Sequence, residues 1–200
     1  MTKLSMLVTA VLLLLLVGTA SADDGYFFEE SIGGAAYRGE LARYGGGAPK
    51  FQFGVGVRRG AWTVTGFGGA LVPDFYAIDC YGPAECAAFE APSPGLATGG
   101  IDVRKRWRLL SLQRWGRPGV YERPGVFVGL RGGPRWFFGY DALDGFSGPG
   151  IGGAASVEGD LWVMGYFVDL GIDVMRLQGP EGTLRGSTPY LIFGAKVGWL

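Results

Sequence analysis

The sequence of 200 residues contains no histidine, carries no net charge and has only two cysteines. Histidine is the usual general base at neutral pH and the commonest metal ligand, so its absence argues against serine and cysteine triads and against zinc-activated water. The 18 basic residues are matched by 18 acidic ones, whereas nucleic-acid-binding proteins usually carry a clear basic excess. We therefore expect no enzymatic activity, no cofactor, no metal site and no nucleic-acid partner.

Glycine, in contrast, is abundant, with 38 residues. These glycines follow no strict three-residue period, which excludes collagen. Each glycine inside a helix costs roughly 1 kcal/mol, so the composition also argues against a helical protein. Apolar residues make up 48% of the chain, too many for a disordered one. The composition therefore predicts a folded all-β protein.

The N-terminal segment has the features of a secretory signal peptide. Lys3 supplies a positive start, residues 6–17 are apolar, and Ala20-Ser21-Ala22 fits the cleavage pattern. The apolar run is shorter than the about 20 residues of a transmembrane helix, and no cysteine follows the cleavage site to carry a lipid anchor. We predict a cleaved signal peptide over residues 1–22 and one exported barrel domain over residues 23–200.

After residue 22 the chain shows the alternation typical of β-strands. Residues Phe51, Phe53, Val55 and Val57 alternate with Gln52, Gly54, Gly56 and Arg58. The same pattern recurs over residues 100–107, 162–173 and 190–199, and weaker runs lie near residues 27–38, 61–72, 125–133 and 150–158. Eight strands of about 9 to 12 residues match the length with which a tilted strand crosses a bilayer.

Two of the weaker runs are ambiguous. In the first strand, Ile32 and Ala36 compete with Ala35 and Tyr37 for the apolar face. In the strand after Ala61, Trp62 and Val64 have one parity while Phe67 and Leu71 have the other. A β-bulge in that strand is one way to reconcile the two parities.

The connections between these strands alternate in length, as the periplasmic turns and external loops of outer-membrane barrels do. Short turns are predicted at residues 58–60 and 158–160, and long connections at residues 39–49, 73–95, 134–149 and 175–188. The connection over residues 109–124 departs from the pattern, because it is long and falls on the predicted periplasmic side.

Four tryptophans fall at one end of the predicted barrel: Trp62, Trp107, Trp162 and Trp199. Amphipathic aromatic rings collect at membrane interfaces, and membrane barrels carry them as girdles. In a soluble β protein, tryptophans at strand ends would instead cap a hydrophobic core. We favour the girdle.

The face opposite the apolar residues consists of glycine and charged residues, namely Asp102, Arg104, Arg106, Arg131, Asp169, Asp173 and Lys196. An eight-stranded barrel is only wide enough for its own side chains, so we predict that these charges pair with one another inside it. The alternative, in which they line a pore, needs a wider lumen. Asp169 and Asp173 are roughly 13 Å apart along a strand, beyond the ~5 to 9.5 Å that separates a glycosidase carboxylate pair.

Cys80 and Cys86 lie in the longest predicted external connection. In an exported protein two nearby cysteines favour a disulfide, and a metal site would need further ligands. The surrounding residues are aromatic and mildly acidic, which suits either a binding surface or the membrane interface. The motif Gly148-Pro-Gly-Ile-Gly-Gly153 matches a dinucleotide fingerprint, but at this glycine content about one match is expected by chance.

These features, together with the closing segment from Tyr190 to Leu200, resemble the small outer-membrane β-barrel families of the OmpA/OmpX type. The resemblance implies a closed antiparallel up-and-down transmembrane β-barrel of about eight strands in the outer membrane of a Gram-negative cell. It also implies lipid as a partner and recognition of the last strand by the barrel-assembly machinery. Trp199 is penultimate and Leu200 is last, whereas those families usually end in an aromatic residue.

Two hypotheses of function follow from the sequence, and a third is weaker. The first is a non-enzymatic outer-membrane barrel with a structural or adhesive role carried by its external loops, whose extracellular ligand the sequence does not identify. The alternative is a soluble secreted or periplasmic barrel of lipocalin type that holds an apolar ligand. An outer-membrane lipid hydrolase or acyltransferase is disfavoured by the absence of histidine. The first two hypotheses place the apolar faces on opposite sides of the barrel wall.

Overall fold

The computed structural model describes residues 25–72, 94–111, 125–161 and 164–199. The predicted signal peptide, Cys80, Cys86 and Trp162 lie outside these residues. Eight long strands make up most of the described chain: β1 (Gly25–Ala36), β3 (Gly47–Arg59), β4 (Trp62–Leu71), β5 (Pro94–Ser111), β6 (Gly125–Asp141), β7 (Ser147–Leu161), β8 (Met164–Gly179) and β9 (Gly182–Trp199). A two-residue strand, β2 (Arg38–Gly39), and a short 3-10 helix, η1 (Glu40–Arg43), follow β1.

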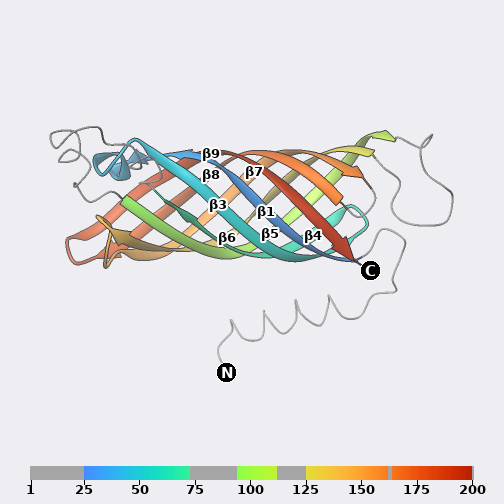
Figure 1. Cartoon of the computed structure of the whole chain (residues 1–200). Coiled ribbons are helices and arrows are strands. Elements are labelled where there is room, and N and C mark those ends of the chain that lie inside the picture. The colour runs from blue at the N-terminus through green and yellow to red at the C-terminus, as the bar shows by residue number, and fades with distance from the viewer. Residues whose placement is uncertain (1–24, 73–93, 112–124, 162–163, 200) are drawn as a thin grey trace, which may run out of the picture.

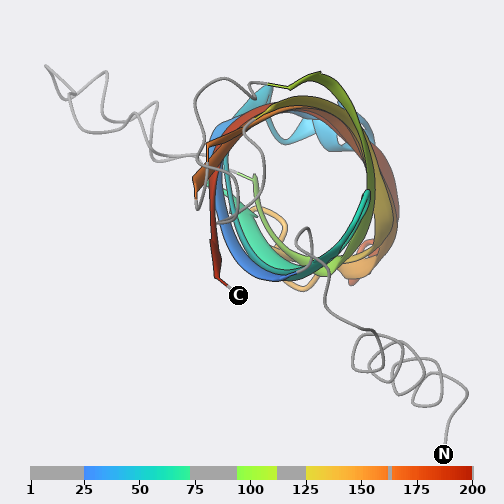
Figure 2. The same cartoon turned by 90° about the vertical axis from the view of Figure 1, so that its right-hand side faces the viewer.

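The long strands form one closed antiparallel barrel (Figure 1). Each strand pairs with the next along the chain, and β1 also pairs with β9, from Tyr26 opposite Trp199 to Ala35 opposite Tyr190. The view along the axis shows the wall closing on itself (Figure 2). The predicted fold class, a closed up-and-down barrel of eight strands, is therefore confirmed.

We name the two ends of the barrel by what lies there. The terminal end holds the start of β1, the end of β9 and the turn between Arg59 and Trp62. The distal end holds the connections β1–β3, β4–β5, β6–β7 and β8–β9. Among the described residues, no helix is long and apolar enough to span a bilayer.

The alternation in the sequence divides each strand between the outside and the inside of the barrel. Along β8 the outward residues Val168, Leu170 and Ile172 are exposed, with Leu170 66% accessible, whereas Asp169 and Asp173 are buried. Exposed apolar surface costs about 25 cal/mol per Å² in water, so this exterior is suited to an apolar solvent. Apolar faces that point outward are the opposite of what the lipocalin-like alternative requires.

The apolar exterior ends before the strands do. On β8 the outward residues change from Ile172 and Val174 to Arg176 and Gln178, all of them exposed. The strand nevertheless stays paired with β9 as far as Gly179 opposite Gly182. The distal part of this hairpin therefore has a polar exterior, as expected of strands that extend beyond a bilayer into water.

This extension makes two predicted loops wrong. The sequence pattern predicts long connections at residues 134–149 and 175–188, but β6 and β7 are joined by residues 142–146 alone, and β8 and β9 by residues 180–181. On β8 the hydrophobic alternation stops where the exterior becomes polar, whereas on β6 it is hidden because Trp136 and Phe138 outside and Phe137 inside are all apolar. Backbone hydrogen bonding depends on neither pattern. The sequence pattern therefore does not mark the strand ends.

The predicted turn at residues 158–160 is also wrong. These residues belong to β7, which continues to Leu161, and the side chains of Glu158 and Asp160 are buried. A Glu-Gly-Asp run has the composition of a turn, but inside a barrel the same charges face partners on other strands. The other tight turn lies close to its predicted place, with Gly60 at a φ of 54°.

The predicted bulge in β4 is absent. β4 keeps one register against β3 and β5 from Trp62 to Leu71, and Phe67 and Leu71 are buried inside the barrel. Their parity differs from that of Trp62 and Val64 because large apolar side chains also fill the interior. A register shift occurs instead between Arg108 and Leu110, in the pairing of β5 with β6.

The facing of β1 is now settled: Phe27 and Glu29 are buried, whereas Ile32 is exposed. Glu30 is also exposed on the outer side, an acidic side chain between Phe28 and Ile32. The predicted inward lining of glycine is only partly correct. Gly34 and Gly159 have the outward parity of their strands, and the position of a Cβ on either is open space.

Candidate functional site

The interior of the barrel contains a balanced set of buried charges. Six carboxylates and six basic groups are buried in the described part of the chain: Glu29, Asp102, Glu158, Asp160, Asp169 and Asp173, with Lys50, Arg104, Arg106, Arg131, Arg135 and Lys196. A buried charge is tolerated only when it is paired. The buried charges of the interior therefore sum to zero, as do the charges of the whole sequence.

Arg131 on β6 lies at the centre of this network. Its guanidinium is 2.9 Å from Asp169 on β8, 3.3 Å from Glu29 on β1 and 3.7 Å from Asp102 on β5. Arg104 reaches two of the same carboxylates, at 3.7 Å from Asp169 and 3.8 Å from Glu29. One guanidinium thus connects three other strands across the lumen.

Toward the distal end the network continues through Asp173. One carboxylate oxygen lies 2.6 Å from the Lys50 ammonium and the other 2.6 Å from the Arg135 guanidinium. Arg135 also donates to Asp102, at 3.1 Å. Lys50 lies over the ring of Tyr190, 3.5 Å from its centroid.

Toward the terminal end the carboxylates of the network are Glu158 and Asp160. Glu158 accepts hydrogen bonds from Arg104 and from Lys196, each at 2.8 Å. Asp160 pairs with Arg106, and Arg58 lies 3.5 Å away from the same carboxylate. The ion pairs therefore form one chain of contacts along the interior.

Aromatic rings and glycines fill the space between these charges. The guanidinium of Arg106 lies 4.3 Å from the Phe127 ring centroid, and that of Arg135 lies 4.9 Å from the Phe67 ring. A Cβ on Gly152 would overlap Arg135, and one on Gly171 would overlap the Tyr190 ring. These glycines are needed for the close approach of long side chains.

At the distal end the interior changes from charged to apolar. The buried residues there form one cluster, hereafter the distal plug: Tyr37, Leu41, Ala48, Leu71, Leu96, Phe137, Leu143, Phe146, Met175, Leu177 and Leu184. Leu41, which η1 contributes, is fully buried. Burial raises the pKa of Tyr37 above its ordinary value, so its hydroxyl stays protonated and donates to the Pro94 carbonyl oxygen at 2.6 Å.

All seven predicted interior charges lie inside the barrel: Asp102, Arg104, Arg106, Arg131, Asp169, Asp173 and Lys196. The structure joins Arg131 to Asp102 and Asp169 and Arg104 to Asp169, but it pairs Arg106, Asp173 and Lys196 with charges outside the predicted set. It adds five buried charges that the sequence analysis missed, namely Glu29, Lys50, Arg135, Glu158 and Asp160. Lys50 and Arg135 continue the inward parity of Gln52 and Arg131, so a longer strand prediction would have included them.

The predicted aromatic girdle is partly within the described residues. Trp62 and Trp107 are exposed on the outer wall near the terminal end, and Trp199 lies opposite Tyr26 at the same end. Lys105 lies between the first two, 5.1 Å from the Trp62 ring centroid and 5.5 Å from that of Trp107. Trp136 and Phe138, which were not predicted, are exposed toward the distal end.

This arrangement is a network of ion pairs. Each buried carboxylate lies within 4.0 Å of at least one basic group, so the carboxylates are held as ion-pair partners. Within the described ranges, no cluster of histidine, cysteine, aspartate and glutamate is arranged to hold a metal ion. Cys80 and Cys86 fall between β4 and β5, outside the described residues, so their disulfide stays a prediction.

The fold has a known counterpart, although no protein family matches the sequence. The crystal structure of Neisserial surface protein A (NspA) is 12% identical, covers 91% of this chain and all of its own, and superposes with a TM-score of 0.56. A major outer membrane protein from Thermus thermophilus is 15% identical over 87% of this chain and 99% of its own, with a TM-score of 0.39. No family model and no curated protein matches the sequence. The resemblance to small outer-membrane barrels is thus confirmed at the level of fold.

Proposed function

We propose that this protein is a non-enzymatic outer-membrane barrel whose role is to hold its distal connections at the cell surface, where they bind a partner. The observation that carries the proposal is the division of the wall: exposed apolar side chains outside, ion pairs and a packed apolar plug inside. A barrel of this kind anchors its distal connections in the membrane, and it neither passes solutes nor turns over a substrate.

The distal end is the surface that we assign to the outside of the cell. Outer-membrane barrels have short periplasmic turns and longer extracellular connections, and the longest connection here joins Leu71 to Pro94 at the distal end. The polar part of the β8–β9 hairpin, with Arg176 and Gln178 exposed, also lies beyond the apolar band at this end. A signal peptide over residues 1–22 would direct the chain to export.

The test of membrane insertion uses fractionation of expressing cells, followed by electrophoresis of unboiled and boiled samples. We expect the protein in the outer-membrane fraction, with a mobility that changes on boiling because a closed barrel resists unfolding in detergent. Recovery in the soluble fraction without a mobility change would rule out the membrane barrel. Labelling of reduced intact cells by an impermeant thiol reagent at Cys80 and Cys86 tests the orientation, and absence of labelling on surface-expressed protein would reverse it.

The binding role is tested separately with refolded protein on arrays of purified glycans and matrix proteins. The control replaces residues 73–93 with a Gly-Ser segment of equal length and must keep the heat-dependent mobility change. We expect at least one probe to retain the native chain and not the control. Equal retention of both proteins on every probe would contradict the binding role while leaving the barrel intact.

A further inference from the structure

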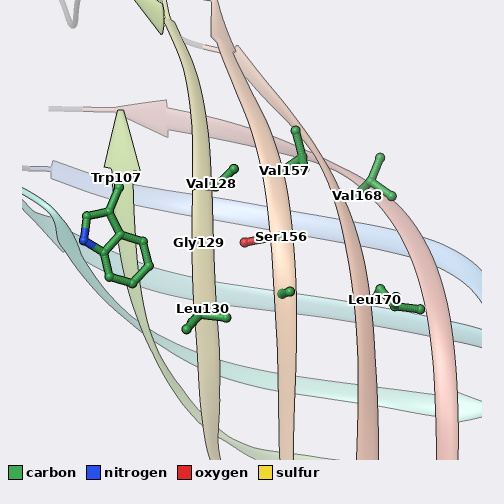
Figure 3. A pocket seen from close by; sticks show the side chains of 9 residues that line it. Trp107, Val128, Gly129, Leu130, Ser156, Val157, Val168 and Leu170 are labelled. Carbon is green, nitrogen blue, oxygen red and sulfur yellow. The ribbon is translucent and has the colours of Figure 1, made fainter. Parts of the chain in front are cut away.

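A shallow apolar furrow runs along the outer side of β7, between β6 and β8. Its walls are outward side chains, Val128 and Leu130 on β6 and Val168 and Leu170 on β8 (Figure 3). The floor is low at Ala155, between Leu130 and Leu170, and higher at Val157, between Val128 and Val168. The furrow is therefore about one strand wide and apolar on both sides.

A second apolar hollow lies toward the terminal end of the barrel, and the exposed side chain of Val157 stands between the two hollows. The second hollow shares Val157 and Val168 with the first and extends past Gly159 to Tyr166. Glu158 contributes to this hollow, but its carboxylate accepts hydrogen bonds from Arg104 and Lys196 inside the barrel. The outer surface of both hollows is thus apolar and uncharged, and the furrow around Ala155 suits contact with a hydrocarbon chain.

A positive charge lies at one rim of this furrow. Lys105 on β5 is directly opposite Leu130 in the pairing with β6, and opposite Trp62 in the pairing with β4. Its ammonium lies near the rings of both Trp62 and Trp107, and Trp107 itself lines the furrow (Figure 3). Cation–π contacts with two tryptophans hold the amine in place while leaving N–H groups to donate to a ligand.

The position of this lysine points to the chemistry of the ligand. Exposed tryptophans mark the level of the lipid headgroups, and an ammonium at that level attracts anionic lipid by about 1 kcal/mol. A hydrocarbon furrow with a cationic rim is complementary to a lipid that has an anionic headgroup.

We propose that the furrow binds one acyl chain of an anionic phospholipid whose phosphate contacts the Lys105 ammonium. The lipid is then a specific ligand of the barrel wall, in addition to the lipid that surrounds the whole exterior. This site is on the membrane-facing wall near the terminal end, and it does not depend on what the distal connections bind.

Native mass spectrometry of the refolded full chain in detergent tests the proposal, with phosphatidylglycerol and phosphatidylcholine of identical acyl chains as probes. We expect the first phosphatidylglycerol to bind about fivefold more tightly than phosphatidylcholine, the factor that corresponds to about 1 kcal/mol. Lys105→Gln should remove this preference and Lys105→Arg should keep it. Ala155→Phe, which fills the floor of the furrow, should weaken binding of both lipids.

The matched control is Ala70→Phe, which places the same ring on the outer face of β4, away from the furrow, and should leave both affinities unchanged. Equal affinity of the native chain for the two lipids would overturn the proposal, as would a preference that survives Lys105→Gln. A dominant dimer that Ala155→Phe dissociates would assign the furrow to a second copy of the chain and would also overturn it. All variants must first show the heat-dependent mobility of a folded barrel.

Discussion

Arg131 illustrates how single side chains stabilise the interior of this barrel. Its guanidinium contacts Glu29, Asp102 and Asp169, which come from three other strands. A buried ion pair contributes little net stability relative to an apolar pair, but removal of one partner leaves the other charge without compensation. The cost of losing Arg131 therefore arises mainly from the carboxylates that remain.

We predict that Arg131→Met lowers the free energy of unfolding by about 3 to 5 kcal/mol. Urea titration of the refolded protein in detergent, followed by tryptophan fluorescence, measures this change. Arg176→Met is the matched control, because Arg176 is exposed on the distal part of β8 and surface substitutions usually change stability by less than about 0.5 kcal/mol. Equal stabilities of the two variants would contradict the role of the network.

Neighbouring strands fit together through glycines that leave room for a ring. Gly171 on β8 lies opposite Tyr190 on β9 in the register, and a Cβ at position 171 would overlap the tyrosine ring and approach the carbonyl oxygen of Gly153. The ring in turn lies under the Lys50 ammonium. The contact between β8 and β9 thus positions the Tyr190 ring against Lys50, which belongs to the charge network.

Gly171→Ala should destabilise the barrel by about 1 to 3 kcal/mol, the usual cost of adding a methyl group to a filled interior. Gly34→Ala on β1 is the control, because the position of its Cβ is open space and the exchange removes only chain entropy from the unfolded state. The midpoint of the boiling-dependent mobility change reports both. A midpoint for Gly171→Ala at or above that of Gly34→Ala would show that the tyrosine can move aside at no cost.

The barrel as a whole combines three environments in one wall and lumen. The exterior is an apolar band with tryptophans near both ends, the interior holds ion pairs, and the distal plug closes the lumen with apolar side chains. Eight strands leave space only for side chains. Together these features describe a barrel that spans a bilayer without opening a passage through it.

The native chain should therefore show no unitary conductance steps in a planar lipid bilayer. A 16-stranded porin reconstituted in the same way is the positive control, because its wider barrel encloses an aqueous channel. Stable, reproducible steps from the native chain, at a protein concentration that gives none after boiling, would show that the ion pairs and the distal plug separate in the membrane.

The sequence predicts much of the fold because inside and outside alternate with a period of two residues. In β8 and in the second half of β9, every outward residue from Val168 to Val174 and from Leu191 to Val197 is apolar, and the structure keeps that parity. Prediction is poorer where both faces have similar polarity. On the distal half of β6 the faces do not differ, since Trp136 outside and Phe137 inside are both apolar. On the distal half of β9 the faces are reversed, since Arg185 is outside and Leu184 inside, and the Glu158 to Asp160 segment has the composition of a turn.

The candidate site was predictable as a set of residues but not as a set of contacts. Parity alone placed Asp102, Asp169 and Arg131 on the inward face. It did not show that Asp173 would pair with Lys50, which is 123 residues away and on a strand that is not its neighbour. The furrow beside Lys105 could not be predicted from the sequence either. Its depth depends on the side chains of two flanking strands, and the sequence does not show which residues of those strands lie beside Ala155.

The sequence by itself determined that this chain is a β protein with one apolar and one polar face, because side-chain alternation and composition are local properties. Only the tertiary structure decided which charges meet, where the lumen is closed and where the wall is hollowed. Closing the barrel fixes the register of every strand against its neighbours, and that register brings together the inward groups of distant strands. The closed sheet therefore decides which acidic and basic side chains form ion pairs. The equal numbers of charges in the sequence stabilise the structure only through these pairs inside the barrel.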